Sequence, residues 1–426
     1  MSKKQVILGA QFPGVNNFTV WSHPQAGSQI AIESFLHFAK TLERGKFDFM
    51  FLAEGLRLRE QKGRIYENDV AGRPNTLAIL AALAGVTEGL GFINTLSSTF
   101  NEPAILAREL ASFDYLSGGR VGWNVVTSPN DFTGANFRRG GFLPYADRYD
   151  RARGFVEAAR ELWASPGQDY DLGPYGRGHF GLPKDHDYRP VIAQAGDSDA
   201  GRDFAASHAD VIYSRHGTLA EGQAFYRDVK ARVLKNGREA GALKILPGAN
   251  VILGGTEDEA RYNLRQIRLA QVSPRAAIAL LEQTWNRDLS AYDAEGPLPE
   301  IEPDFEGDKL SQGRTRQHDD ARETVRQWRA LAEAEGLSIR ELVIRVTARQ
   351  HFVGTPESVA REINDYVQKD ASDGFVFAPH YTPGGFDDFV DQVIPILQDW
   401  GVFRRDYAEP TLRGNLGLRD PLPLVA

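Results

Sequence analysis

The sequence predicts an α/β fold, a (β/α)₈ or TIM barrel with large loop insertions. Short, nearly continuous apolar runs alternate with amphipathic helical segments along the chain, a pattern that indicates parallel strands covered on both faces. About eight such units can be counted, which is the number that closes a barrel. The first unit lacks a glycine-rich phosphate turn, which argues against the alternative of a doubly wound open sheet.

The expected strands are compact apolar runs, each followed by a helical segment. They span residues 5–12, 47–53, 91–95, 120–126, 190–195, 210–213, 246–253 and 374–378. The helices between them carry apolar residues at i, i+3, i+4 and i+7. Ser28 is expected to cap the first helix and Gly45 to end it. Pro103 suits the first turn of a later helix, and Asp147 can cap the helix after that.

A barrel of about 250 residues leaves roughly 175 residues for insertions and a tail. We expect the whole chain, 1–426, to form a single barrel domain rather than several domains. The longest insertion is expected at 271–320, where helix-like pieces adjoin a run rich in Pro, Glu and Asp. A lid or oligomer contact is favoured there over disorder. Residues 406–426 form the expected C-terminal tail.

Composition excludes several classes of protein. Hydrophobic residues make up 42% of the chain and charged residues 25%, as in globular proteins. No apolar run approaches the roughly 18 residues of a membrane-spanning helix and no signal peptide is recognisable, so a cytoplasmic location is expected. The absence of cysteine excludes disulfides, thiolate metal sites and cysteine nucleophiles. The net charge of −8 and the lack of a concentrated basic patch argue against nucleic-acid binding.

Candidate functional residues stand where the expected strands end, because barrel enzymes carry their chemistry at that rim. A carboxylate, an amide, hydroxyls and an imidazole occupy these positions. They predict a hydrogen-bonding pocket without an obvious nucleophile or metal site. The residues concerned are Glu54, Thr95, Asn124, Ser198 and His380.

The turn 196–201, which contains Ser198, admits three interpretations. Backbone N–H groups and a hydroxyl at a helix start suit an anion such as a phosphate. Alternatively, Ser198 only caps its helix. A nucleophile elbow is the third, but the turn is one residue too long for it and no His-plus-acid partner can be assigned. Tyr145 and Tyr149 bracket another helix start, so their hydroxyls can reach a ligand at the barrel mouth or serve packing.

Aromatic and histidine residues in loops are further candidates for a substrate pocket, on loop position alone. His23 and His380 are the candidates for a catalytic acid or base. The other pocket candidates are Trp21, Phe100, Phe142, His351 and Tyr381. No H-E-x-x-H motif is present, and no metal site is expected.

An ordered series of motifs runs through the chain, and the most specific is Ser-Gly-Gly-Arg-Val-Gly-Trp-Asn-Val-Val-Thr at 117–127. Others are Trp-Ser-His-Pro at 21–24, Phe-Leu-Ala-Glu at 51–54, Asp-Arg-Tyr-Asp at 147–150, Val-Gly-Thr-Pro-Glu at 353–357 and Pro-Gly-Gly-Phe-Asp-Asp-Phe at 383–389. With these motifs the chain resembles the nitrilotriacetate/dibenzothiophene-sulfone monooxygenase family of bacterial luciferase-like flavin-dependent enzymes.

The resemblance implies a two-component monooxygenase on a (β/α)₈ barrel. Such an enzyme takes reduced FMN (FMNH₂) from a separate NAD(P)H-dependent flavin reductase. It then uses O₂, through a flavin C4a-(hydro)peroxide, to oxidise a small organic substrate of the organosulfur or N-substituted acid class. The cofactor supplies the chemistry and the protein supplies orientation and shelter from water. A homodimer or homotetramer is expected.

The resemblance also assigns roles residue by residue. Glu54 stands where the family usually has an aspartate at the flavin, and Thr95 matches a threonine near the isoalloxazine. Tyr149 matches a tyrosine at a helix start, and Ser198 matches the serine at the FMN phosphate. Tyr145 stands where the family often has histidine, and a phenol is no ready proton donor near neutral pH.

Three other functions stay open. One is a deazaflavin-dependent hydride-transfer enzyme of the same superfamily. Another is a barrel hydrolase with Ser198 as nucleophile, and the last is a non-catalytic flavin-binding protein. The pocket itself should separate substrate classes, because an aminopolycarboxylate needs several convergent Arg or Lys side chains and an aromatic sulfone needs a mostly apolar wall.

Overall fold

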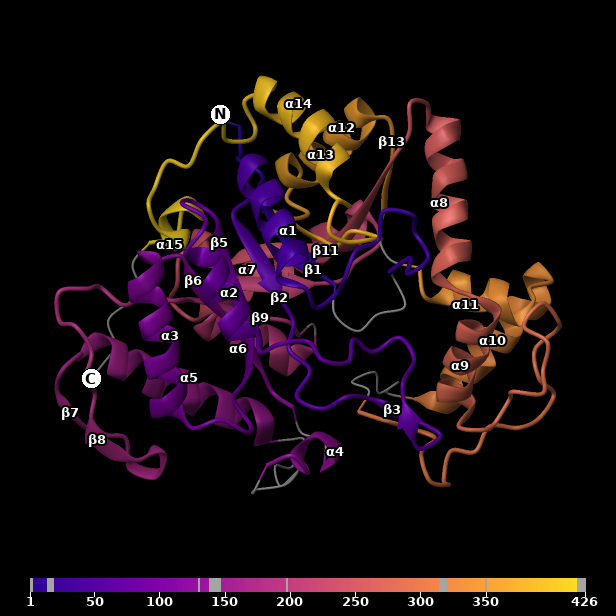
Figure 1. Cartoon of the computed structure of the whole chain (residues 1–426), viewed down its shortest axis with the longest axis horizontal. Helices are drawn as coiled ribbons and strands as arrows, with labels where there is room; N and C mark the ends of the chain where they lie inside the picture. Colours follow the sequence, from indigo (N-terminus) through magenta and orange to yellow (C-terminus); the bar gives the residue numbers. More distant parts are fainter. Residues whose placement is uncertain are drawn as a thin grey trace.

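Eight parallel strands close into a barrel in the computed structural model, which describes residues 3–13, 19–128, 131–137, 147–196, 198–313, 320–348 and 351–419 (Figure 1). The strands follow one another around the barrel in chain order, and β1 pairs with the last of them, β14. They are β1 (Ile7–Phe12), β2 (Phe49–Leu52), β5 (Gly91–Ser97), β6 (Val121–Val126), β9 (Val191–Gln194), β10 (Val211–Ser214), β11 (Lys244–Leu253) and β14 (Gly374–Phe377). The predicted (β/α)₈ barrel is therefore confirmed, and each barrel strand lies where an apolar run predicted one.

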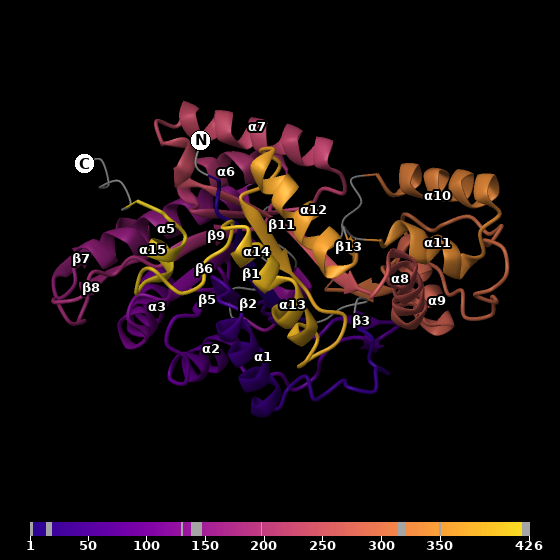
Figure 2. The ribbon, with the colours of Figure 1, turned by 90° about the horizontal axis from the view of Figure 1, so that it is seen from above.

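Helices cover the outside of the barrel, as two perpendicular views show (Figures 1 and 2). Each of the first six follows one barrel strand and returns the chain to the start of the next. These helices are α1 (Ile32–Arg44), α2 (Thr76–Ala84), α3 (Pro103–Ser117), α5 (Arg148–Ala164), α6 (Asp199–His208) and α7 (Leu219–Lys235); near the C-terminus lie α12 (Pro356–Gln368), α13 (Asp387–Gln392), α14 (Ile394–Asp399) and α15 (Leu412–Asn415). Among the described residues, none of the helices combines the length and apolar character needed to cross a bilayer.

Of the two signals expected at the ends of the first helix, the cap at Ser28 is wrong and the end at Gly45 is confirmed. Ser28 does not cap α1, because its Oγ accepts hydrogen bonds from the N–H groups of Ile30 and Ala31 and the helix begins only at Ile32. Gly45 does end α1, but the left-handed residue is Lys46, with φ 56°. A side chain at Gly45 would instead collide with Val390, since a Cβ there would lie 2.7 Å from Val390 Cγ2.

One end of the barrel, where the strands begin, is closed by residues from the C-terminal segment 406–419, which we call the floor segment. Leu412, Leu416 and Leu418 pack into a cluster with the inward side chains of the barrel strands. Those strand residues are Ile7, Phe49, Ile93, Val191, Ala193, Val211, Leu246 and Val376. Three leucines of the expected tail, Leu412, Leu416 and Leu418, are thus part of the barrel core, while 420–426 lie outside the described residues.

A ninth strand, β13 (His351–Gly354), was not predicted. It pairs with the second half of β11, from Asn250 opposite His351 to Leu253 opposite Gly354. β11 is ten residues long and extends beyond the barrel wall, which creates room for this pairing. Only two of the four residues of β13 are buried, so its sequence lacks the apolar run that marks the barrel strands.

Between β11 and β13 the chain forms a helical insertion with a core of its own. It comprises α8 (Glu257–Gln271), α9 (Pro274–Trp285), α10 (Ala321–Glu335) and α11 (Ile339–Val346), which lie to one side of the barrel (Figure 2). Its core residues include Val272, Leu281, Trp285, Ile339 and Val343. The insertion therefore extends well beyond the expected 271–320 on both sides, and 314–319 fall outside the described residues. Its role as a lid stays a prediction.

A small antiparallel sheet joins the insertion to the loop after β2. The hairpin β3 (Glu60–Gln61) and β4 (Arg64–Ile65) pairs with β12 (Ser311–Gln312) of the insertion. Lys62 at the hairpin tip forms an ion pair of 2.6 Å with Asp288. Elsewhere lie the hairpin β7 (Asp169–Asp171) and β8 (Arg177–His179), the short helix α4 (Asp131–Gly134), and the 3₁₀ turns η2 (Gly173–Tyr175) and η3 (Ala240–Ala242).

Candidate active site

Two of the predicted rim residues meet inside the barrel mouth. Thr95 on β5 lies opposite Asn124 on β6, and Asn124 Nδ2 donates a hydrogen bond of 3.1 Å to Thr95 Oγ1. Both side chains are buried. Thr95 points inward because Ile93, two residues earlier on the same face of the strand, belongs to the cluster at the floor. This pair presents a hydroxyl and an amide to whatever fills the barrel mouth.

Glu54 lies just past β2 and is held by the next helix. Thr76 Oγ1, at the start of α2, donates a hydrogen bond of 2.6 Å to Glu54 Oε2. Burial raises the pKa of the Glu54 carboxyl, and the bond from Thr76 opposes that rise. The carboxylate is therefore half-buried at the rim, with one oxygen engaged by α2.

Tyr149 lies over the turn between β9 and α6. Its hydroxyl accepts a hydrogen bond of 3.4 Å from Gln194 Nε2. A Cβ at Gly196 would lie 2.7 Å from this hydroxyl, and one at Gly201 would lie 2.8 Å from it. Two glycines thus allow the phenol to reach the turn that holds Ser198. Among the described residues, the buried Oε1 atom of Gln194 has no hydrogen-bond partner.

Ser198 caps α6, as one of the three interpretations proposed. Its Oγ accepts a hydrogen bond of 3.3 Å from the N–H of Gly201. The N–H groups of Asp199 and Ala200, in the first turn, have no partner within the helix. The Asp199 carboxylate forms an ion pair of 2.9 Å with Arg232, which reduces its repulsion of a second anion at this helix end. A cap and an anion site are therefore compatible here.

A group of aromatic and imidazole rings lies at the end of β14. The His23 ring stacks on Tyr381 with centroids 3.8 Å apart and meets His380 edge-on at 5.9 Å. The Tyr381 hydroxyl donates a hydrogen bond of 2.8 Å to Gln25 Oε1. Burial, and then the charges of His23 and His351, lower the pKa of His380 to about 4. At neutral pH the His380 imidazole is therefore uncharged and able both to donate and to accept a hydrogen bond.

This low pKa has a measurable consequence for stability. Because the unfolded chain binds a proton at His380 below about pH 6.5 and the folded chain only near pH 4, stability is lost as the pH falls through that window. One pKa unit corresponds to about 1.36 kcal/mol, and partial exposure reduces the effect. We expect His380→Asn to remove about 2 kcal/mol of the acid destabilisation between pH 7.5 and pH 4.5.

Urea unfolding of both proteins at the two pH values measures this difference. Burial raises the pKa of Asp114 to about 6, which has the opposite effect in the same window, but both proteins share it and it cancels. His37→Asn is the control: it removes an exposed histidine of α1 that pairs with Asp387 at 2.9 Å, and loss of that pair should not reduce the acid destabilisation. An unchanged pH dependence in His380→Asn would contradict the assignment.

The remaining predicted pocket residues lie in different surroundings. Trp21 is 43% exposed, whereas Phe100 is buried and stacks on Phe137 with centroids 4.7 Å apart. Phe142 and Tyr145 lie outside the described residues. The roles of these residues, like those of His23 and His380, stay predictions.

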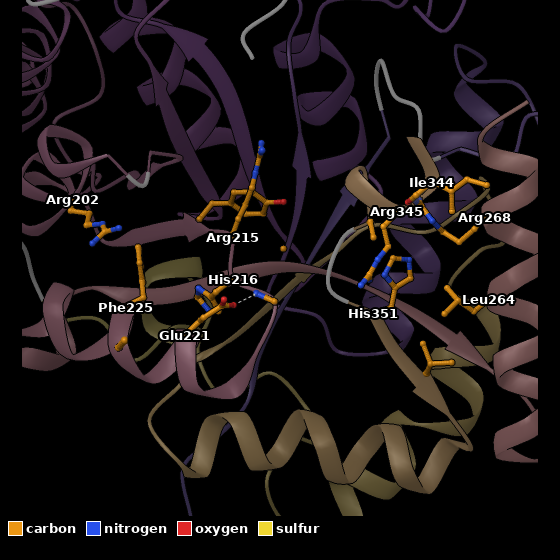
Figure 3. A pocket seen from close by; sticks show the side chains of 16 residues that line it. Arg202, Arg215, His216, Glu221, Phe225, Leu264, Arg268, Ile344, Arg345 and His351 are labelled. Atoms are coloured by element: carbon orange, nitrogen blue, oxygen red, sulfur yellow. Dashed lines mark hydrogen bonds between the residues drawn. The ribbon is translucent and has the colours of Figure 1, made fainter. Parts of the chain in front are cut away.

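The structure also shows a cavity of about 1020 Å³ between the barrel rim and the helical insertion (Figure 3). Of the predicted pocket residues that the structure describes, only His351 on β13 lines it. The sequence interpretation missed its arginines. Arg215 directly follows β10 and could have been found as a strand-end residue, but Arg268 on α8 and Arg345 on α11 come from insertion helices that no motif connects to the rim.

Comparison with known proteins places this geometry in context. Residues 15–373 match the family model described as luciferase-like monooxygenase. The chain is 37% identical to nitrilotriacetate monooxygenase component A of Aminobacter aminovorans, covering 100% of this chain and 99% of the relative. It is 34% identical to dibenzothiophene-sulfone monooxygenase of Rhodococcus erythropolis (strain XP), covering 99% and 98%. The crystal structure of riboflavin lyase, with modified FMN and riboflavin, is similar with a TM-score of 0.75, 27% identity and coverage of 97% and 96%.

Proposed function

The chain belongs to the luciferase-like monooxygenase family, and from this premise we propose that it is a two-component monooxygenase dependent on FMNH₂. It uses O₂ to oxidise a small organic substrate of the organosulfur or N-substituted acid class. A separate NAD(P)H-dependent flavin reductase supplies the reduced FMN. The observation that carries the proposal is similarity over the full length to two monooxygenases, one of them named as a component A, on a barrel whose rim presents the polar groups a flavin needs.

The rim residues fit FMN in their chemistry. An FMN phosphate needs hydrogen-bond donors, and the first turn of α6, the Ser198 hydroxyl and the Tyr149 hydroxyl offer them. Gly196 and Gly201 keep side chains away from this turn, where a Cβ would meet the Tyr149 hydroxyl. The unpartnered Gln194 Oε1 can accept a hydrogen bond from a ribityl hydroxyl. These features support a phosphate and sugar site at the end of β9.

Thr95 and Asn124 would hold the flavin ring. Their hydroxyl and amide can bind polar ring edges, and Glu54 lies at the next strand end. Bound reduced FMN supplies the electrons that activate O₂. The protein's part is to orient the ring and to exclude water, and the packed floor segment closes the far end of the barrel. Neutral His380 can hold a substrate polar group through a hydrogen bond without competing for the proton near pH 7.

Reduced-flavin binding tests the phosphate site directly. We expect Ser198→Ala to weaken anaerobic binding of FMNH₂ by about tenfold or more, because a hydrogen bond to a charged group contributes roughly 1.5–3 kcal/mol. Ser273→Ala is the matched control, since Ser273 caps α9 through the same bond to a backbone N–H. Both variants lose about 1 kcal/mol of stability with the cap, but only Ser198→Ala loses flavin affinity. Equal flavin affinity in both variants would contradict the proposed phosphate site at Ser198.

The wild-type protein separates the broader alternatives. With a flavin reductase, NADH and O₂, the proposal requires tight FMNH₂ binding and product formation that depends on oxygen. Preference for a reduced deazaflavin indicates the hydride-transfer enzyme instead. Ester hydrolysis lost in Ser198→Ala indicates a hydrolase, and flavin binding without oxygen-dependent product indicates a binding protein. Assembly as a homodimer or homotetramer is part of the proposal, and analytical ultracentrifugation measures it.

A further inference from the structure

The cavity beside the barrel mouth is lined by more basic than acidic side chains. Its lining, which we call the cationic pocket, joins the ends of β10 and β11 to α8, α11 and β13. Figure 3 shows Arg215, His216 and Glu221 on one side of the pocket and Arg268, Arg345 and His351 on the other. The basic side chains lining it are Arg202, Arg215, His216, Arg268, Arg345 and His351, and the acidic side chain is Glu221.

The carboxylate of the pocket, Glu221, is already bound by backbone N–H groups at the start of α7. Glu221 accepts hydrogen bonds of 2.9 Å and 3.1 Å from the N–H groups of Gly217 and Thr218, as part of the capping box of α7. Those bonds lower the pKa of Glu221, so it stays ionised at the helix start. Two of the arginines also have acidic partners outside the pocket lining. Arg202 pairs with Asp228 at 3.0 Å, and Arg345 lies 3.9 Å from Glu335.

Arg215 has no such partner. In the part of the chain that the structure describes, its guanidinium makes neither a hydrogen bond nor an ion pair. It follows β10 directly, and its neighbour Tyr213 turns its hydroxyl toward Gly248, where a side chain would collide with it. At this strand end a cation without a partner among the described residues, Arg215, and a phenol, Tyr213, therefore both line the pocket.

Arg268 supplies a second charge from the opposite wall. Its side chain is buried, and it donates hydrogen bonds to Gln271 Oε1 at 2.9 Å, the carbonyl of Ile344 at 2.6 Å and Thr347 Oγ1 at 3.1 Å. All three acceptors are neutral. Burial lowers the pKa of Arg268, which reflects the cost of a charge removed from water without an anion beside it. An anionic group in the pocket would offset that cost.

We propose that the cationic pocket binds a substrate with at least two carboxylate groups, one at Arg215 and another on the side of Arg268 and Arg345. This inference rests on the proposed function and selects the N-substituted acid class over a neutral organosulfur compound. Guanidinium groups suit the task because each can bind a carboxylate with two parallel hydrogen bonds. The FMN phosphate does not need this pocket, since Ser198 and Tyr149, its proposed donors, do not line it.

Equilibrium binding to the protein, measured with and without FMN, tests the charge requirement without turnover. The probes are nitrilotriacetate and its trimethyl ester, which share a skeleton and differ in three negative charges. We expect calorimetry to detect binding of the acid, weakening with added salt, and at least tenfold weaker binding of the ester. Equal binding of acid and ester, or binding of neither, would overturn the proposal.

Arg215→Gln tests whether Arg215 binds a substrate carboxylate. The Arg215 side chain is exposed and has no hydrogen-bond or ion-pair partner among the described residues, so the variant should fold, unlike substitutions of Arg268. We expect acid affinity to fall at least tenfold, with Arg215→Lys in between because it keeps the charge but not the planar fork. Arg261→Gln, on the same helix as Arg268 but 65% exposed and paired with Asp258, is the matched control and should bind as the wild type does. Wild-type acid affinity in Arg215→Gln would overturn the assignment.

Measurements on the same proteins distinguish a failure of this inference from a failure of the proposed function. FMNH₂ affinity is measured on the wild type and on Arg215→Gln before any acid is added. Loss of acid binding with normal FMNH₂ affinity supports the cationic pocket. A wild type that binds nitrilotriacetate but not FMNH₂ would contradict the monooxygenase and leave the anion site standing, whereas the reverse result would contradict only the anion site.

Discussion

Replacing Gly374 with alanine is expected to destabilise the fold by about 4 kcal/mol or more. Gly374 begins β14 and lies opposite Ile7 of β1, at the seam where the first and last barrel strands pair. A Cβ there would lie 2.6 Å from the nitrogen and the carbonyl carbon of Ile7, with the carbonyl oxygen closer still. Because these are backbone atoms of the neighbouring strand, no side-chain rotation relieves the collision.

A second glycine provides the comparison. Gly241 lies exposed in the 3₁₀ turn η3, and a Cβ there would meet nothing within 4 Å. Gly241→Ala should leave stability unchanged or raise it by up to about 1 kcal/mol, since alanine restricts the unfolded chain. Urea unfolding monitored by circular dichroism measures both variants. A Gly374→Ala protein as stable as the wild type would show that β1 and β14 do not pair as closely as described.

Arg413→Met should be the next most damaging substitution, at about 3 kcal/mol near pH 7. Arg413 of the floor segment holds the buried Asp210 carboxylate with two hydrogen bonds, of 2.6 Å and 3.3 Å. Burial alone raises the pKa of Asp210, but the Arg413 guanidinium, with help from Arg160 and the N–H of Ile192, holds it below its ordinary value. Removing one partner of a buried pair leaves a charge that is costly to bury.

The pH dependence of this loss of stability shows whether it comes from the buried ion pair between Arg413 and Asp210. A carboxyl whose folded pKa is depressed stabilises the fold above its unfolded pKa, and that contribution disappears as the pH falls and the carboxyl is protonated. In Arg413→Met the pKa of Asp210 rises, so the difference from wild type should shrink between pH 7 and pH 4.5. Arg405→Met removes an exposed pair with Asp399 and should cost less than about 1 kcal/mol. A difference that does not change with pH would assign Arg413 to packing alone.

The barrel was predictable because its strands carry their own signal. A parallel strand covered on both faces is apolar along its length, and each run such as 91–95 or 374–378 indicated a strand without knowledge of its partners. β13 lacked that signal because it pairs with an extension of β11 outside the covered wall. The prediction that Ser28 caps the first helix was wrong for a local reason, since its hydroxyl binds the N–H groups of a turn before the helix begins.

The candidate site was predictable to a similar extent. Thr95 and Asn124 stood out at strand ends, and the parallel register then places them side by side. Arg268 and Arg345 gave no comparable signal, because they sit on amphipathic helices where arginine is usually a solvated surface residue. Their position in the same pocket as Arg215 follows from how the insertion packs against β11 and β13, which is a tertiary contact. The charge of the pocket therefore emerged only from the folded chain.

The floor segment has a consequence for how the protein is made. The core of the barrel contains Ile7 from the beginning of the sequence together with Leu412, Leu416 and Leu418 from near its end. A nascent chain therefore cannot complete this core until residue 418 has left the ribosome. Until then the inward faces of the early strands lack their final partners and stay open to aggregation, which makes the growing polypeptide a client for chaperones.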